Sequence, residues 1–79
     1  MVEAYIIITV AIGKENHVFD GLCKVKEITD VSILYGEWDI VAKVKTDKIE
    51  DLDPLVTGKI RTIPGVKTTI TMIVARSKK

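Results

Sequence analysis

Apolar positions recur along the chain in two different periods, and each change of period marks a new element. Residues 2–12 are rich in β-branched side chains and end at Gly13, so they predict a first strand. Residues 14–28 carry apolar side chains three and four positions apart, which predicts an amphipathic helix with Asn16 as its N-cap. The apolar stripe of this helix is Val18, Phe19, Leu22, Val25 and Ile28.

The middle of the chain switches to a period of two and then back to helical spacing. Residues 30–35 and 40–45 alternate apolar and polar positions and predict the two strands of a hairpin. Residues 47–63 predict a second helix, although Pro54 lies inside it. Two structures fit this proline: a helix that restarts there with Asp53 as N-cap, or one kinked helix. The restart is preferred, because proline suits the first position of a helix.

Residues 66–75 predict the last strand, since Pro64 and Gly65 end the helix and allow the chain to reverse. Simple alternation places Val66 and Thr68 on one face of this strand and Thr69 on the other. The resulting βαββαβ order is that of a ferredoxin-like α+β fold, a four-stranded antiparallel sheet with two helices on one face. Residues 1–79 are therefore expected to form a single domain.

The predicted first and last strands are apolar or threonine-lined on both faces, yet the helices can cover only one face. A single copy would expose a large uncharged surface, which face-to-face packing with a second copy would bury. A chain of 79 residues also has a small core, and its single cysteine excludes an internal disulfide. A homo-oligomer is expected from these features alone.

Charge and composition exclude several classes of function. Lysine and arginine number 12 and aspartate and glutamate 11, so direct nucleic-acid binding is not expected. The apolar run at residues 4–12 is too short to span a membrane and does not resemble a signal peptide, which favours a cytoplasmic protein. His17 and Cys23 have no companions at catalytic or metal-ligand spacing, so no catalytic residue, metal or cofactor is expected. Cys23 is expected to be a small buried side chain.

The sequence Gly36-Glu37-Trp38-Asp39 connects the predicted hairpin strands and holds the chain's one tryptophan. Gly36 supplies the positive φ that such a connection needs. A large apolar side chain is unusual in a turn, and Asp39 suits either a cap on the turn's amides or a partner for a ligand's ammonium group. Turn and binding site both remain open on this chemistry.

Two stretches carry a family resemblance that covers most of the chain. LYGEWDIVAKV resembles the Gly-x-aromatic-Asp hairpin of the effector-binding domain of Lrp/AsnC transcription regulators, called RAM for regulation of amino-acid metabolism. KIRTIPGVKTTITMIV is similar to that domain's helix end and last strand. The resemblance implies dimers of the α+β barrel type, built by packing sheet faces. It also implies rings of dimers, such as octamers, with an amino acid or similar small effector bound between dimers near the hairpin.

By position, the resemblance also implies a set of ligand-binding residues. Gly36 and Asp39 match the hairpin residues implicated in effector response, and Thr69 and Thr71 match paired threonines of the last strand. Tyr35 and Trp38 occupy neighbouring positions of the pocket wall. In this interpretation, Asp39 accepts hydrogen bonds from an α-ammonium group, while the threonine hydroxyls and backbone amides near Gly36 hold the polar end.

The chain begins at its first strand, where family regulators carry a helix-turn-helix domain, so it looks like a stand-alone RAM domain and DNA binding is not carried over. The expected function is a non-enzymatic, effector-binding, oligomer-forming domain linked to transcription regulation. It would also be suited to mixed assembly with full-length Lrp/AsnC regulators. Two alternatives stay open: a small enzyme of the dimeric α+β barrel type, which needs an ionisable side chain between helices and sheet, and a purely structural assembly partner.

Overall fold

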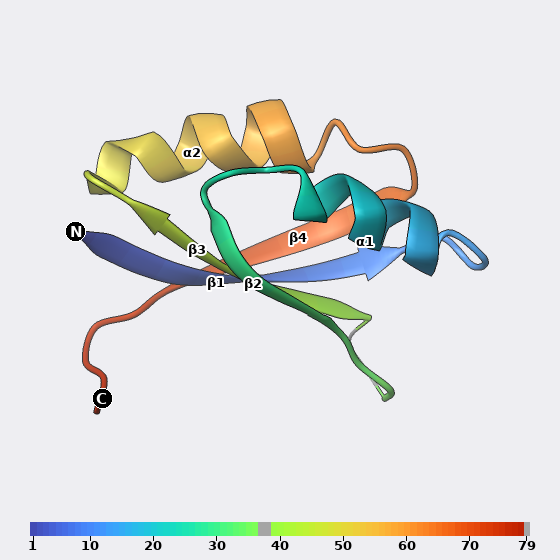
Figure 1. Ribbon diagram of the computed structural model, residues 1–79, viewed down its shortest axis with the longest axis horizontal. Coiled ribbons are helices and arrows are strands. Elements are labelled where there is room, and N and C mark those ends of the chain that lie inside the picture. Colours follow the sequence, from blue (N-terminus) through green and yellow to red (C-terminus); the bar gives the residue numbers. More distant parts are fainter. Residues whose placement is uncertain (37–38, 79) are drawn as a thin grey trace.

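The computed structural model describes residues 1–36 and 39–78, which form a four-stranded antiparallel sheet with helices on one face (Figure 1). The strands are β1 (Val2–Val10), β2 (Ile28–Ile33), β3 (Ile40–Thr46) and β4 (Val66–Ile73). They lie in the order β2-β3-β1-β4, so β1 and β3 are central while β2 and β4 form the edges. The predicted ferredoxin-like order βαββαβ is confirmed.

Helix α1 (Glu15–Cys23) is shorter than predicted. The expected N-cap is wrong, because Asn16 lies inside the helix and Lys14 precedes it without a side-chain cap. Ile28 continues the helical spacing but is the first residue of β2, so it reaches the core from a strand. Cys23 is exposed, contrary to expectation, because each helical residue is rotated by about 100° from the last and the preceding Leu22 takes the buried direction.

The second helical segment runs without a break through three geometries. A 3₁₀ turn, η1 (Ile49–Asp51), leads into α2 (Leu52–Leu55) and then into a π-helical turn, η2 (Val56–Ile60). The predicted restart at Pro54 with Asp53 as N-cap is therefore wrong. Pro54 lies in the turn that follows the 3₁₀ segment, where the hydrogen-bond ladder is changing type and the loss of one N–H donor does not end the helix.

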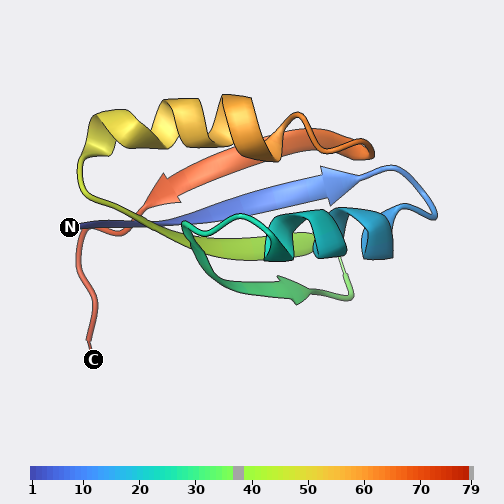
Figure 2. The same cartoon turned by 45° about the horizontal axis from the view of Figure 1, so that its top comes forward.

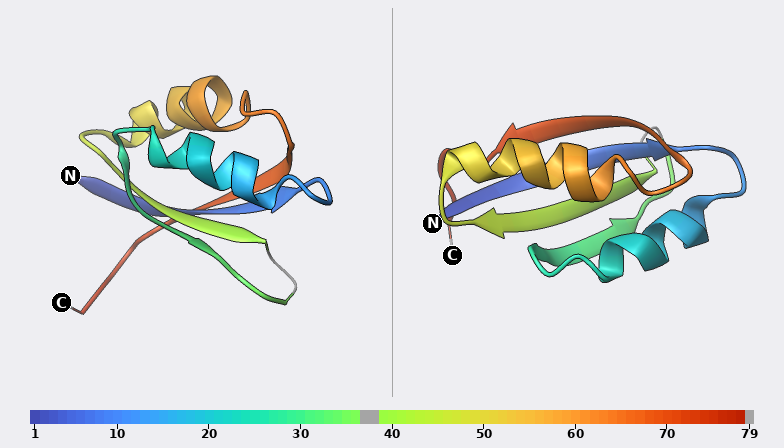
Figure 3. Two further views of the ribbon diagram at one scale, coloured as in Figure 1. Left: turned by 45° about the vertical axis from the view of Figure 1, so that its right-hand side comes forward. Right: turned by 90° about the horizontal axis from the view of Figure 1, so that it is seen from above.

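Both helical segments lie over the same face of the sheet, with α1 towards the β2 edge (Figures 2 and 3). The core between them is aliphatic, and alternate residues of β1 and β3 supply its floor. The buried apolar residues are Ala4, Ile6, Ile8, Val10, Val18, Leu22, Ile40, Ala42, Val44, Leu52, Leu55, Val56 and Ile60. Val18 and Leu22 belong to the apolar stripe predicted for the first helix, and the other members of that stripe are partly buried against this core. Burial of this continuous apolar surface is the main stabilising contribution in so small a domain.

The register between β1 and β4 shifts near the end of β1. Thr9 pairs with Thr68, but Val10 pairs with Val66, so one residue of β4 bulges out between them. Val66 therefore shares the helix-facing side with Thr69, and the alternation predicted for this strand is wrong at its first residue. The bulge lies where β4 begins, next to the turn that follows η2.

The other face of the sheet, hereafter the open face, is not covered by the helices. Its middle is apolar and consists of Tyr5, Ile7, Val41, Ile70 and Met72. Ile70 is 43% exposed and Met72 48% exposed, so the expected apolar surface is uncovered in the middle of this face. The expectation that the face is uncharged is wrong, because Lys43 of β3 pairs with Tyr5 on it. One end of this face is charged, where Glu3 lies 3.4 Å from the ammonium group of Lys45.

Candidate functional site

The hairpin between β2 and β3 is closed by a backbone hydrogen bond from the Leu34 N–H to the Asp39 carbonyl, 2.8 Å long. Gly36 has a φ of 126°, which confirms the need for glycine at this turn. Tyr35 is fully exposed. The predicted site residue Trp38 lies outside the described residues, as does Glu37.

The carboxylate of Asp39 reaches across to β1. Its Oδ2 accepts a hydrogen bond of 2.9 Å from the backbone N–H of Val10 in a partly buried position. A hydrogen bond to a charged group contributes about 1.5–3 kcal/mol. Sequence reasoning missed this contact, because Asp39 was expected to cap its own turn or bind a ligand. Neither periodicity nor turn chemistry signals a contact between residues 29 positions apart.

Thr69 and Thr71 lie side by side on the helix-facing side of the edge strand β4. Thr69 pairs with Ile8 and Thr71 with Ile6, both of which are fully buried. Thr71 is exposed and Thr69 half-buried, because helix coverage thins towards the sheet edge. The structure therefore brings the two predicted threonines together and leaves their face of β4 open to a neighbour.

The hairpin and the threonine pair stand on opposite sides of β1. Ile8 pairs with Ile40 of β3 on one side and with Thr69 of β4 on the other. Asp39 directly precedes Ile40, so two inter-strand spacings, about 10 Å, separate its strand from that of Thr69. Among the predicted site residues that the structure describes, Asp39 and the two threonines therefore lie on different sides of β1.

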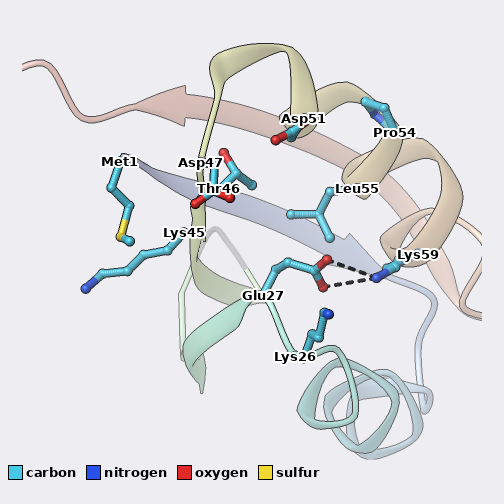
Figure 4. A pocket seen from close by; sticks show the side chains of 10 residues that line it. All are labelled: Met1, Lys26, Glu27, Lys45, Thr46, Asp47, Asp51, Pro54, Leu55 and Lys59. Atoms are coloured by element: carbon cyan, nitrogen blue, oxygen red, sulfur yellow. Dashed lines mark hydrogen bonds and ion pairs between the residues drawn. The ribbon is translucent and has the colours of Figure 1, made fainter.

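A cleft of about 420 Å³ opens at the other end of the sheet, between the second helical segment and the start of β2 (Figure 4). Its lining residues are Met1, Lys26, Glu27, Lys45, Thr46, Asp47, Asp51, Pro54, Leu55 and Lys59. Glu27 and Lys59 face each other across it, with the ammonium nitrogen 3.0 Å from Oε2. The hydrogen bonds from Lys59 hold the pKa of Glu27 below its ordinary value.

A smaller cavity of about 230 Å³ lies on the open face, lined by Tyr5, Asp30, Ser32, Leu34, Val41 and Lys43. Lys43 stands 5.7 Å from the centre of the Tyr5 ring, within the range of a cation–π contact. Neither this cavity nor the cleft is lined by a predicted site residue among the parts of the chain that the structure describes.

Residues 1–36 and 39–78 place their potential metal ligands apart and form only short helices. No three His, Cys, Asp or Glu side chains within these ranges are grouped so that they could hold a metal ion. No helix in the same ranges is long and apolar enough to cross a membrane. His17 is exposed on α1.

The βαββαβ order, the four-stranded antiparallel sheet and the helices on one of its faces define a domain of the ferredoxin-like class. Residues 3–79 match the Lrp/AsnC ligand binding domain, and the chain belongs to that family. The predicted family membership is thereby confirmed.

Similar proteins include full regulators and a structure of comparable length. The HTH-type transcriptional regulator FL11 of Pyrococcus horikoshii is 38% identical over 76 residues, which make up 96% of this chain and 50% of the regulator. The chain thus spans about half the length of the curated relatives it matches. The crystal structure of FFRP-DM1 is 42% identical, has a TM-score of 0.88 and is matched over 99% of its length and 94% of this chain.

A more distant structure shares the fold alone. The complex of the Neisseria meningitidis transcriptional regulator NMB0573 with L-Met has a TM-score of 0.88 at 18% identity. The match covers 99% of this chain and 52% of that regulator.

Proposed function

We propose that this domain binds an amino acid or a closely related small effector in a pocket formed between copies of the chain, as part of transcription regulation. The observation that carries the proposal is the division of the candidate site, with Asp39 on one side of β1 and Thr69 and Thr71 on the other. Because polar side chains lie on both sides of β1, a ligand could contact one group in one copy and the other group in a neighbouring copy. The L-Met complex of the distant Neisseria regulator supports an amino acid as the ligand.

Homo-oligomerisation is part of the proposal. The apolar middle of the open face is the surface through which two copies would pack into a dimer of the α+β barrel type. The hairpin end of the molecule also exposes Ile12 and Tyr35 completely, which supplies apolar contacts for joining dimers into a ring such as an octamer. Mixed assembly with full-length Lrp/AsnC regulators would use the same surfaces.

In the proposed pocket, the threonine hydroxyls and the backbone amides near Gly36 hold the polar end of the effector. Tyr35 forms part of its wall, and Asp39 stands at the base of the hairpin that carries Tyr35 and Gly36. Threonine hydroxyls both donate and accept, so they suit the carboxylate as well as the ammonium group of an amino acid.

A catalytic function is less well supported than binding. An enzyme with its cleft between helices and sheet would need an ionisable group there. The described residues fill that space with aliphatic side chains, and their one buried polar residue, Thr46, donates its hydroxyl to the Lys48 carbonyl at 2.9 Å. We therefore propose a non-enzymatic domain.

The test is calorimetric titration of the purified protein with each of the common amino acids. We expect at least one of them to bind. Thr69→Val and Thr71→Val should each weaken that binding about 2- to 12-fold, the loss of one hydrogen bond of roughly 0.5–1.5 kcal/mol. Thr29→Val, which changes an exposed threonine on β2, is the matched control and should bind like the parent chain.

If no amino acid binds and the oligomer still forms, the effector part of the proposal is wrong. The domain would then be a structural assembly partner. Equal weakening by all three valine substitutions would instead show that the threonines of β4 have no particular place in the site.

A further inference from the structure

Asp39 accepts two hydrogen bonds that hold the base of the hairpin. The Asp39 carbonyl accepts from the Leu34 N–H at 2.8 Å, which closes the hairpin on itself. The Asp39 carboxylate accepts from the Val10 N–H at 2.9 Å, which ties the hairpin to β1. The first bond belongs to the turn, whereas the second fixes where the turn stands relative to the sheet.

Val10 lies beyond the last residue pair that joins β1 to β3, which is Ile8 with Ile40. Among the residues that the structure describes, the acceptor of its N–H is the Asp39 side chain. Val10 is also only 6% exposed, so water is a poor substitute if the carboxylate is removed.

Ala11, which directly follows β1, makes the opposite connection. The Ala11 N–H donates to the Gly65 carbonyl at 2.8 Å, and Gly65 directly precedes β4. Successive N–H groups of a strand point to opposite sides, so Val10 reaches the hairpin while Ala11 reaches the start of the threonine strand. Hydroxyl groups of Thr9 and Thr68 add a further contact between β1 and β4 at this point.

We infer that Asp39 is a positioning residue: its carboxylate fixes the hairpin on Val10 and, through the neighbouring Ala11–Gly65 bond, sets the hairpin relative to β4 and its threonines. This role requires an oxygen that accepts the hydrogen bond from the Val10 N–H, and it does not require a negative charge. The inference deepens the proposed function and rests on it only where ligand binding is the readout.

The two possible roles of Asp39 make different demands on its side chain. A direct contact with a ligand's ammonium group needs the negative charge, which Asp39→Asn removes. Positioning through Val10 needs one carbonyl-type oxygen at the same place, which asparagine retains and alanine lacks. The two substitutions therefore separate the roles in a way that alanine alone cannot.

The first experiment needs no ligand. Amide hydrogen exchange at Val10 and Leu34 is measured by NMR in the full chain, in Asp39→Asn and in Asp39→Ala. Asp20→Ala, which removes an exposed carboxylate from α1, is the control for lost charge. We expect Asp39→Ala to speed exchange at Val10 at least tenfold, and Asp39→Asn and the control by less than threefold. Unchanged exchange in Asp39→Ala, or equally fast exchange in Asp39→Asn, would overturn the inference.

The second experiment uses an amino acid that the full chain binds. We expect the dissociation constant of Asp39→Asn to stay within threefold of the parent and that of Asp39→Ala to rise at least tenfold. If Asp39→Asn binds as weakly as Asp39→Ala while Val10 remains protected, the charge contacts the ligand and positioning is not the role that controls binding. If the parent chain binds no amino acid, the proposed function fails, and the exchange experiment still decides whether Asp39 fixes the hairpin.

Discussion

At the residue scale, Gly65 and Gly58 differ in whether a side chain could replace the hydrogen on their α-carbon. Gly65 has a φ of 104°, and a β-carbon there would lie 2.9 Å from Lys14 Cβ and 3.0 Å from Val18 Cγ2. Gly58 lies in η2 with open space around the position that a β-carbon would take. Glycine is thus required at the first position, whereas at the second it costs helix stability.

We expect Gly65→Ala to lower the free energy of unfolding by about 2–3 kcal/mol, from backbone strain and from displacement of Lys14, which directly precedes α1. Gly58→Ala should raise it by up to about 1 kcal/mol, the difference in helix propensity. Urea denaturation of both variants measures these changes. A Gly65→Ala protein as stable as the parent would show that the turn before β4 can adopt another backbone conformation.

Single residues were predictable where local chemistry decides and unpredictable where distant segments meet. The need for glycine at Gly36 followed from turn geometry alone. The partner of Asp39 did not, because Val10 comes close only through the register of β1 and β3. Cys23 was misplaced because it follows the buried Leu22 by about 100° around α1 and therefore points away from the core.

At the scale of elements, order and type could be predicted but boundaries could not. Ile28 satisfies helical spacing from Leu22 and Val25, and it also suits a strand, so periodicity alone could not end α1. Proline chemistry predicted a break at Pro54, yet packing of Leu52, Leu55 and the following apolar residues on the sheet keeps the segment continuous.

One ion pair joins the second helical segment to the start of β2. Glu27 and Lys59 contact each other with their side chains 25% and 49% exposed, so solvent screens the pair and its contribution is about 0.2–1 kcal/mol. Lys59 lowers the pKa of Glu27 from the ordinary value of 4.5 in the folded state. The stabilisation is therefore complete above that ordinary value and is lost as the pH falls through the lowered pKa.

We expect Lys59→Gln to lower the unfolding free energy by up to about 1 kcal/mol at pH 7 and to have no effect once Glu27 is protonated in both states. Urea denaturation at neutral and strongly acidic pH measures the difference. Lys67→Gln, which removes an exposed lysine from β4, is the control and should match the parent at both values. A loss that persists in acid would mean that Lys59 stabilises the fold through its methylene groups.

At the scale of the whole molecule, a single copy leaves the apolar middle of the open face exposed to water. We expect Ile70→Asp to reduce the assembled mass measured by light scattering at least twofold while the circular dichroism spectrum stays that of the parent, because a charge is costly at a desolvated interface. Ile49→Asp changes a residue that is 53% exposed on the helical side and should leave assembly intact. The reverse result would place the subunit contact on the helices.

The position of the hairpin and the threonines on either side of β1 has a thermodynamic consequence. If each copy carries only part of the site, the effector is a ligand of the assembly and not of the chain. Its apparent affinity then rises with protein concentration, and saturating effector shifts the subunit equilibrium towards association by the same coupling free energy. Such a domain would respond jointly to the abundance of a metabolite and to its own expression level.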